Sequence, residues 1–350
     1  MKNLLAFLFA TILILIIGEV VLKFYHPLPT LVKGDQIILN TNFKTIITNE
    51  VNPKLDSEIL VSKNSIGFRG PNLPKHLEDH YSIITVGGST TECLYSNDDK
   101  TWTHLLNKRL AKDIDDLWVN NAGLSGHSTF GHIIFMKDHI IDLNPDMVLF
   151  LVGVNDLARS SQGPFKSKKA EPGKGWFRSE IYTLIFNLYS AQKAKVAAIS
   201  YDKAFNLMQQ PDIIIDSVER TEQIESHDFY LILYENRLLE LITICQGNNI
   251  EPVFLTQPAL FGDLMDPTTG VDLGTIRWGE LDGSTGWQVL ELYNELVRKV
   301  CEENEIALID LAKLLPKDSK YFWDLLHYTN EGNEKVAEVV GEKLLKLISD

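Results

Sequence analysis

Ser89 stands in a sequence context that suits a catalytic nucleophile. It follows two glycines in the segment VGGSTT, residues 86–91, directly after an apolar run. Glycines allow the tight turn that exposes a hydroxyl, and a serine at the start of a helix lies where unpaired backbone N–H groups stabilise negative charge. Taken alone, the segment is more typical of a glycine turn followed by a helix cap.

An activating pair for this serine is found near the C-terminus. Asp324 and His327 lie three residues apart in the segment WDLLHYT, residues 323–329. At this spacing both side chains can lie on one side of a turn, so the carboxylate can orient the imidazole and stabilise its cation. A single pair of this kind is more often found in a surface turn.

Two further segments offer hydrogen-bond donors for a developing oxyanion. Gly123, in NNAGLSG at residues 120–126, has a backbone N–H that can face a cleft, and Asn155, in GVND at residues 153–156, has a side-chain amide. Such donors stabilise the tetrahedral intermediate of acyl transfer. An ordinary strand-to-helix loop and an Asx-turn would explain the same residues.

The pattern of apolar residues indicates which elements position these segments. Short, nearly continuous apolar runs are typical of strands buried on both faces, and they are found at residues 81–86, 118–120, 147–152, 252–256 and 306–310. Amphipathic stretches typical of helices are found at residues 102–112, 132–143, 229–246, 287–304 and 331–348. The alternation predicts a parallel α/β sheet with helices on both faces.

The four segments share one location in this predicted sheet. Ser89, Gly123 and Asn155 follow the first three strands, and Asp324 and His327 come just before the last helix. Ligands of such sheets bind outside the carboxyl ends of the strands. Four unrelated caps would not be expected in this arrangement, so the sequence predicts a serine esterase with all five residues in one site.

At these residues the chain resembles the SGNH hydrolase superfamily, also called GDSL-type esterases and lipases, over residues 81–350. The family's blocks are named after Ser, Gly, Asn and His, which here are Ser89, Gly123, Asn155 and His327, with Asp324 as the acid. The resemblance implies a three-layer α/β/α, flavodoxin-like fold with a parallel five-stranded sheet. It also implies an oxyanion hole formed by Ser89, Gly123 and Asn155.

The first block departs from the commonest form of the family, because Gly88 stands where an aspartate usually precedes the serine. Membrane-anchored bacterial members carry this GGST variant. They often carry a segment like NSIGFRG, residues 64–70, and a glutamate near the end of the anchor. The resemblance therefore points to that subgroup.

The N-terminus predicts a membrane anchor. Residues 4–22 are mostly apolar and carry a single charge, Glu19, and their number matches the roughly 20 residues that a bilayer-spanning helix needs. No small-x-small cleavage site follows, so we expect an uncleaved signal anchor at residues 1–25. We expect a juxtamembrane segment at 26–80 and the hydrolase domain at 81–350, with an insertion at about 157–227. Flanking lysines are nearly balanced, and a single-pass protein with an extracytoplasmic catalytic domain is expected.

Composition narrows the classes of partner. The formal net charge is −14 and no Lys/Arg cluster stands out, so nucleic acid is not expected as a partner. The three cysteines show no zinc-ligand spacing, and neither a metal nor another cofactor is expected. Cys245 and Cys301 lie in helical patterns and are predicted to be core residues.

The substrate is less well determined than the mechanism. We expect an ester on a cell-envelope glycan, such as an O-acyl group; Trp278 is a candidate for stacking on a sugar, whereas Trp287 is expected to pack in the domain. The alternatives are a lipid-directed esterase, lysophospholipase or thioesterase, an O-acyltransferase that passes the acyl group to a sugar hydroxyl, and a non-catalytic binding or assembly protein with the same fold.

Overall fold

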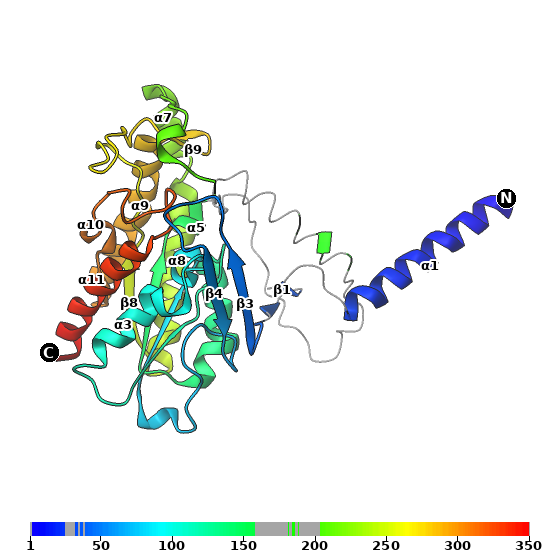
Figure 1. Ribbon diagram of the computed structural model, residues 1–350, viewed down its shortest axis with the longest axis horizontal. Coiled ribbons are helices and arrows are strands. Elements are labelled where there is room, and N and C mark those ends of the chain that lie inside the picture. The colour runs from blue at the N-terminus through cyan, green and yellow to red at the C-terminus, as the bar shows by residue number, and fades with distance from the viewer. Residues whose placement is uncertain are drawn as a thin grey trace.

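A five-stranded parallel sheet lies at the centre of the protein (Figure 1). The computed structural model describes residues 2–24, 32–33, 36–37, 39–157, 181, 184–185, 188 and 204–349. The sheet has the order β11-β8-β7-β5-β6. Its strands are β5 (Tyr81–Gly87), β6 (Leu117–Asn121), β7 (Met147–Val152), β8 (Glu251–Thr256) and β11 (Ala307–Ile309).

The predicted strands and their parallel arrangement are confirmed. Counted along the chain, the spatial order is 2-1-3-4-5, the flavodoxin-like order, with β5 and β7 adjacent at the switch point. Strand β7 lies at the centre and all six of its residues are buried. This burial on both faces explains why the strand appears in the sequence as an uninterrupted apolar run.

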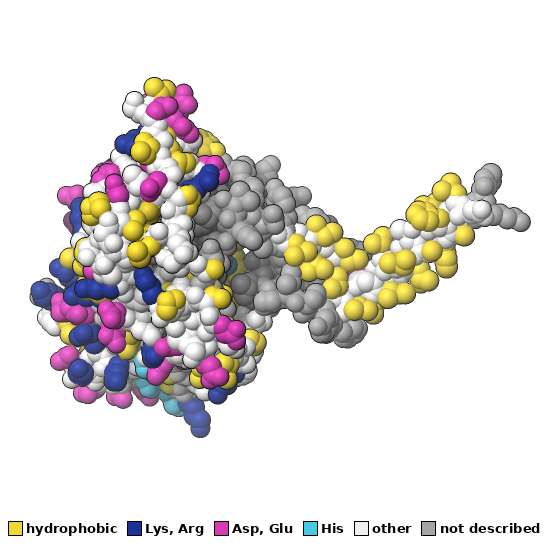
Figure 2. Space-filling view, turned by 45° about the horizontal axis from the view of Figure 1, so that its top comes forward, with side chains coloured by type: hydrophobic (Ala, Val, Ile, Leu, Met, Phe, Trp, Pro, Cys, Tyr) yellow, Lys and Arg dark blue, Asp and Glu magenta, His cyan; other side chains and the backbone are white. Residues whose placement is uncertain are grey.

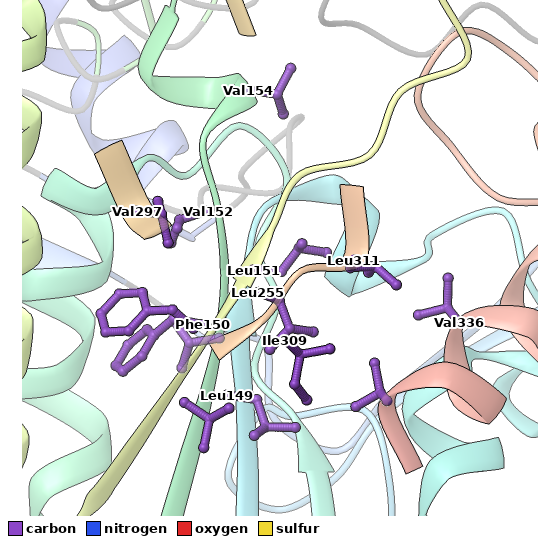
Figure 3. Close-up of a cluster of buried hydrophobic side chains, with 14 of the residues drawn as sticks. Leu149, Phe150, Leu151, Val152, Val154, Leu255, Val297, Ile309, Leu311 and Val336 are labelled. Carbon is purple, nitrogen blue, oxygen red and sulfur yellow. The ribbon is translucent and has the colours of Figure 1, made fainter. Parts of the chain in front are cut away.

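Helices cover both faces of the sheet. On one face α3 (Trp102–Leu110) packs against α11 (Asn330–Ser349), and on the other α8 (Asp228–Gly247) packs against α9 (Gly283–Glu303) and α4 (Thr129–Phe135). In Figure 3, Phe150 and Val152 of β7 lie with Val297 of α9, while Leu151 lies on the side of Val336 of α11. Alternate residues of one strand thus supply both core layers.

Four of the five predicted helices agree closely with the structure, and one differs in form. The stretch predicted as a helix at residues 132–143 begins earlier, as α4, and continues as a π-helical turn (Met136–Ile140) and a 3-10 turn (Ile141–Leu143). It ends where Asn144 takes a left-handed conformation with φ of 46°. The wider π turn keeps Met136 and Ile140 buried.

The remaining elements are short. They are the strands β1 (Val32–Lys33), β2 (Gln36–Ile37), β3 (Phe43–Thr48), β4 (Glu58–Lys63), β9 (Arg277–Trp278) and β10 (Leu281–Asp282), the α-helices α2 (Ser89–Glu92), α5 (Val154–Leu157), α7 (Ser217–Glu225) and α10 (Leu311–Leu314), and the 3-10 turns Leu77–Asp79, Asp98–Lys100 and Leu207–Gln209.

The segment predicted to be juxtamembrane, residues 26–80, contacts the domain closely in its described part. Strands β3 and β4 form an antiparallel hairpin. Beyond it, Arg69 pairs through its backbone with Asn121 at the end of β6, in both directions at 2.9 Å. Lys54, within the hairpin loop, donates to the carbonyl oxygens of Ser319 (2.7 Å) and Phe322 (3.1 Å). These contacts join the segment to the start of the Gly123 loop and to the residues just before Asp324.

The N-terminal residues form the helix α1 (Lys2–Phe24), which extends away from the domain in Figure 1 and carries exposed apolar side chains in Figure 2. Within the described part of the chain, no helix combines the length and apolarity that crossing a membrane requires. The prediction of a transmembrane helix at residues 1–25 is therefore not supported. Most of the predicted insertion at 157–227 lies outside the described residues, which resume at 204.

Candidate active site

The structure brings the three residues of the predicted triad together. The Ser89 hydroxyl lies 2.8 Å from Nε2 of His327, and Nδ1 of His327 lies 2.6 Å from Oδ2 of Asp324. All three residues are buried, and the most exposed of them, Asp324, is 8% exposed. With the proton on Nδ1, the imidazole donates to Asp324 and accepts from Ser89, which is the arrangement required for general-base activation of a serine.

Ser89 is held in a tight turn between β5 and the short helix α2. Strand β5 ends at Gly87, and Ser89 is the first residue of α2. A Cβ atom added to Gly87 would lie 2.1 Å from the Thr91 hydroxyl and 3.0 Å from the Leu151 carbonyl. The glycine is therefore required by the close approach of the turn to its neighbours, and the turn directs Ser89 towards His327.

The Asp324–His327 turn fixes both side chains. Oδ1 of Asp324 accepts from the backbone N–H groups of Leu326 (2.8 Å) and His327 (2.7 Å). The indole of Trp323 stacks on the imidazole, with ring centroids 5.3 Å apart and an interplanar angle of 19°. One carboxylate oxygen thus shapes the turn while the other orients the imidazole.

Asn155, predicted to be an oxyanion donor, lies close to Ser89. It follows β7 in α5 and is 6% exposed. A Cβ added to Gly88 would lie 2.0 Å from Asn155 Nδ2, so the amide rests against the backbone just before Ser89. This contact gives a reason for Gly88 in place of the aspartate that is common in the resembling family.

A buried ion pair braces the start of α5. Asp156 accepts from the Thr129 hydroxyl (2.6 Å) and pairs with Arg237 at 3.0 Å. Burial raises the pKa of Asp156 even though Arg237 and Thr129 favour its charged form. Because Asp156 adjoins Asn155, this network ties the predicted oxyanion donor to α4 and α8.

Gly123, predicted to be an oxyanion donor, is bonded within its own loop. Its backbone N–H donates to Oδ1 of Asn121 at 2.9 Å, within its own loop. A Cβ at Gly123 would lie 2.4 Å from the Glu92 backbone nitrogen, so close packing against α2 explains the glycine. Gly126, three residues on, has a φ of +75° and open space where its Cβ would be. The loop therefore contains a second glycine that borders open space.

A small pocket opens beside Ser89. Its empty volume, which includes the open mouth, is about 210 Å³, and it is lined by Ser89, Thr90, Cys93, Leu94, Tyr95, Ser96, Trp323, His327 and Tyr328. Tyr95 meets Trp323 edge-on, with ring centroids 5.6 Å apart. Trp278 is not part of this lining; it is 7% exposed and stacks on Phe261 at 4.6 Å, so the suggestion that it stacks on a sugar is not supported.

Glu92, a buried carboxylate at the end of α2, was not predicted from the sequence. Its Oε2 accepts from the backbone N–H of Ser125 (2.9 Å) and from the Ser125 hydroxyl, and its Oε1 pairs with Lys63 at 3.1 Å. Burial alone would raise the pKa of Glu92, but Lys63 and Ser125 outweigh it and hold the pKa below its usual value. Glu92 thus links the nucleophile helix to the Gly123–Gly126 loop. Its position three residues after Ser89 was the available signal.

The three cysteines lie in the interior. Cys93, Cys245 and Cys301 are buried, which confirms the prediction for the last two, and burial raises the pKa of each thiol to about 12. Within the described ranges, no group of three or more His, Cys, Asp or Glu side chains is arranged to hold a metal ion.

Comparison with known proteins places the chain in a family. Residues 85–335 match the model of the GDSL-like lipase/acylhydrolase family. Similar solved structures include an acetyl xylan esterase (17% identity, covering 75% of this chain and 98% of that one, TM-score 0.43). They also include a catalytic mutant of an acetylxylan esterase from Geobacillus stearothermophilus (14%, 75% and 94%, 0.44) and TesA (15%, 76% and 99%, 0.43). No curated protein sequence matches this chain.

Proposed function

Because this chain belongs to the GDSL-like lipase/acylhydrolase family and is an ester-hydrolysing enzyme, we propose that it hydrolyses short-chain carboxylic esters through an acyl-enzyme on Ser89. The observation that carries the proposal is the chain of contacts from Ser89 through His327 to Asp324, at 2.8 and 2.6 Å. A serine and a histidine in hydrogen-bond contact, with the histidine oriented by a third group, form an activated nucleophile.

The proposed reaction has two steps. The Ser89 oxygen attacks the ester carbonyl carbon while its proton passes to Nε2 of His327, and the tetrahedral intermediate collapses as His327 returns this proton to the leaving alcohol. Water then attacks the acyl-enzyme and gives one proton to His327. As this second tetrahedral intermediate collapses, the bond to the Ser89 oxygen breaks, His327 returns the proton to that oxygen, and the carboxylic acid leaves. Asp324 stabilises the imidazolium in both steps.

The proposed oxyanion hole consists of the Asn155 amide and backbone N–H groups. The Asn155 side chain lies against Gly88, next to the attacking residue. The backbone N–H of Ser89 is a second proposed donor. The backbone N–H of Gly123, the third donor expected from the sequence, is bonded to Asn121. One such donor is typically worth about 2.7–4 kcal/mol in the transition state.

The pocket favours a small acyl group. Even with its open mouth included, the empty space beside Ser89 is only about 210 Å³. Tyr95 and Trp323 form an aromatic wall next to His327. We therefore propose acetyl or similarly short esters as substrates, with O-acyl groups on cell-envelope glycans as the natural class.

We also propose that the enzyme lies outside the cytoplasm, where it would meet substrates of this class. An apolar stretch at the N-terminus, residues 4–22 here, is what exported proteins carry. Digestion of the catalytic domain by protease added to intact spheroplasts would support this location, and complete protection would contradict it.

Two assays test the proposed activity. A fluorophosphonate probe should label the wild-type enzyme and fail to label Ser89→Ala. On p-nitrophenyl esters of increasing chain length, kcat/KM should be highest for acetate and fall with chain length. Equal labelling of both proteins would refute the role of Ser89, and a preference for long acyl chains would favour a lipid-directed esterase.

A further inference from the structure

Arg69 is a buried arginine that the catalytic mechanism does not use. It belongs to the segment NSIGFRG, residues 64–70, and is 3% exposed. Its backbone pairs with Asn121 at the end of β6, at 2.9 Å in both directions. The Asn121 side chain in turn donates to the Thr91 carbonyl (2.6 Å) and accepts from the Gly123 N–H (2.9 Å). Arg69 is therefore anchored to the loop that faces the nucleophile helix.

The guanidinium of Arg69 binds one turn of the chain through three backbone carbonyls. Nη1 donates to the carbonyl oxygens of Glu92 (2.9 Å) and Cys93 (2.6 Å), and Nη2 donates to that of Ser96 (2.8 Å). Asp98 accepts from Nε (3.0 Å) and Nη2 (2.7 Å), which fixes the plane of the guanidinium. A planar group with five donors suits this task, whereas a lysine ammonium does not.

The turn that Arg69 holds is a wall of the pocket. Residues 93–96 all line the pocket beside Ser89. Cys93 has a left-handed φ of +53°, a conformation that costs a non-glycine residue energy and persists where its surroundings determine it. Arg69 donates to the carbonyl oxygens of the two peptide groups that flank the Cys93 Cα, those of Glu92 and Cys93.

A second contact from the same upstream segment reaches the same turn. Lys63, the last residue of β4, pairs with the buried Glu92 at 3.1 Å, and Glu92 accepts from Ser125 in the Gly123–Gly126 loop. Together, Arg69 and Lys63 attach residues 92–96 to structure outside the sheet and its helices.

We propose that Arg69 is a positioning residue that sets the shape of the acyl pocket and thereby the preference for short acyl groups. The inference rests on the proposed function, since it takes the pocket lined by residues 93–96 as the acyl site. Loss of the guanidinium removes the donors of three carbonyls. The turn at 93–96 then relaxes, and Leu94 and Tyr95 no longer limit the length of the acyl chain.

The test measures acyl-chain selectivity per active site in the full-length enzyme. Active sites are counted by fluorophosphonate titration, so unfolded molecules drop out of the rates. In Arg69→Met, the ratio of kcat/KM for p-nitrophenyl acetate to that for the hexanoate should fall at least about fivefold, or about 1 kcal/mol at 1.36 kcal/mol per tenfold. This fivefold change is smaller than the roughly 10–200-fold difference in kcat/KM that one methylene group makes in a fitted pocket. Arg69→Lys should give an intermediate ratio.

Arg298→Met is the matched control. Arg298 makes three charge-assisted hydrogen bonds, two to Asp310 and one to Glu291, and none of these residues lines the pocket. This variant should lose thermal stability and keep the wild-type acetate-to-hexanoate ratio. An unchanged ratio in Arg69→Met, or the same change in both variants, would overturn the proposal.

A second variant covers the case in which Arg69→Met does not fold. Asp98→Asn removes the charge that aligns the guanidinium and keeps the arginine, so it should lower the ratio in the same direction by a smaller factor. An unchanged ratio in this variant would overturn the proposal. A wild-type enzyme that neither reacts with the probe nor hydrolyses any ester would instead show that the proposed function itself is wrong.

Discussion

Replacing Gly88 with alanine should displace the Asn155 amide and slow the reaction without disturbing the fold. The Gly88 backbone has φ of −87°, so an alanine there does not need a left-handed conformation. The added Cβ would lie 2.0 Å from Asn155 Nδ2, whereas the next atoms, Asn155 Cγ and the His127 carbonyl oxygen, lie at 3.3 and 3.4 Å. The clash therefore falls on the amide nitrogen alone.

The size of the effect follows from that distance. Ordinary contact begins at 3.4 Å, so the amide must move by roughly 1.4 Å, and a misplacement of about 1 Å can cost about 10²-fold. We expect kcat to fall about 10²-fold in Gly88→Ala, and about 10²–10³-fold in Asn155→Ala, the usual loss for one oxyanion donor.

A double-mutant cycle with steady-state kinetics decides whether the two changes act through the same group. Once Asn155 is alanine, the Cβ at position 88 has no amide to displace. The double variant should then be no slower than Asn155→Ala alone, which is strong non-additivity. Multiplicative losses, or a Gly88→Ala enzyme as fast as wild type, would refute the contact as the basis of the effect.

Three further predictions concern the triad, a buried lysine and the core. In Asp324→Asn, the side-chain oxygen should still accept from the two backbone N–H groups that Oδ1 now binds. The NH2 group should then face His327. The wrong tautomer should then lower kcat by about 10⁴-fold at unchanged thermal stability, and initial rates near wild type would contradict this. Burial lowers the pKa of Lys317 to about 7 from 10.5, so the unfolded chain binds more protons between these pH values. The unfolding free energy of wild type should therefore rise relative to that of Lys317→Met by up to about 1.4 kcal/mol per pH unit from pH 7 to 10. Urea unfolding measures both free energies at each pH, and an equal pH dependence in the two proteins would contradict this. Phe150→Ala should lower the free energy of unfolding, measured in urea, by about 3–5 kcal/mol, because Phe150 is fully buried and its ring centroid lies 5.1 Å from that of Phe254. A loss below about 1 kcal/mol would contradict this packing.

The sheet was predictable because its strands are buried on both faces. A run such as residues 147–152 has no polar position to interrupt it, and all six residues are buried. The hairpin β3–β4 was not predicted. All residues of β3 are exposed or half-buried, so the strand leaves little hydrophobic pattern in the sequence. Only Ile59 and Val61 of β4 are fully buried, too few to distinguish a strand in a segment rich in Pro, Asn and Lys.

The proximity of Ser89, Asp324 and His327 was predictable because the carboxyl ends of parallel strands meet at one edge of a sheet. This rule brought Ser89 and His327 together across 238 residues. The hydrogen-bond partner of Gly123 was not predictable in the same way. Its N–H is taken by the Asn121 side chain, and a local rotamer of that kind leaves no periodic pattern. The partners of Arg69 are backbone carbonyls, which every residue carries, so the sequence could not single them out.

The most direct test of the central claim is mass spectrometry of the fluorophosphonate adduct. The wild-type enzyme should carry one adduct, on Ser89, and Ser89→Ala should carry none, while His327→Ala should react much more slowly because the serine is no longer activated. An adduct on another residue, or undiminished ester hydrolysis by Ser89→Ala, would contradict the assignment of Ser89 as the nucleophile.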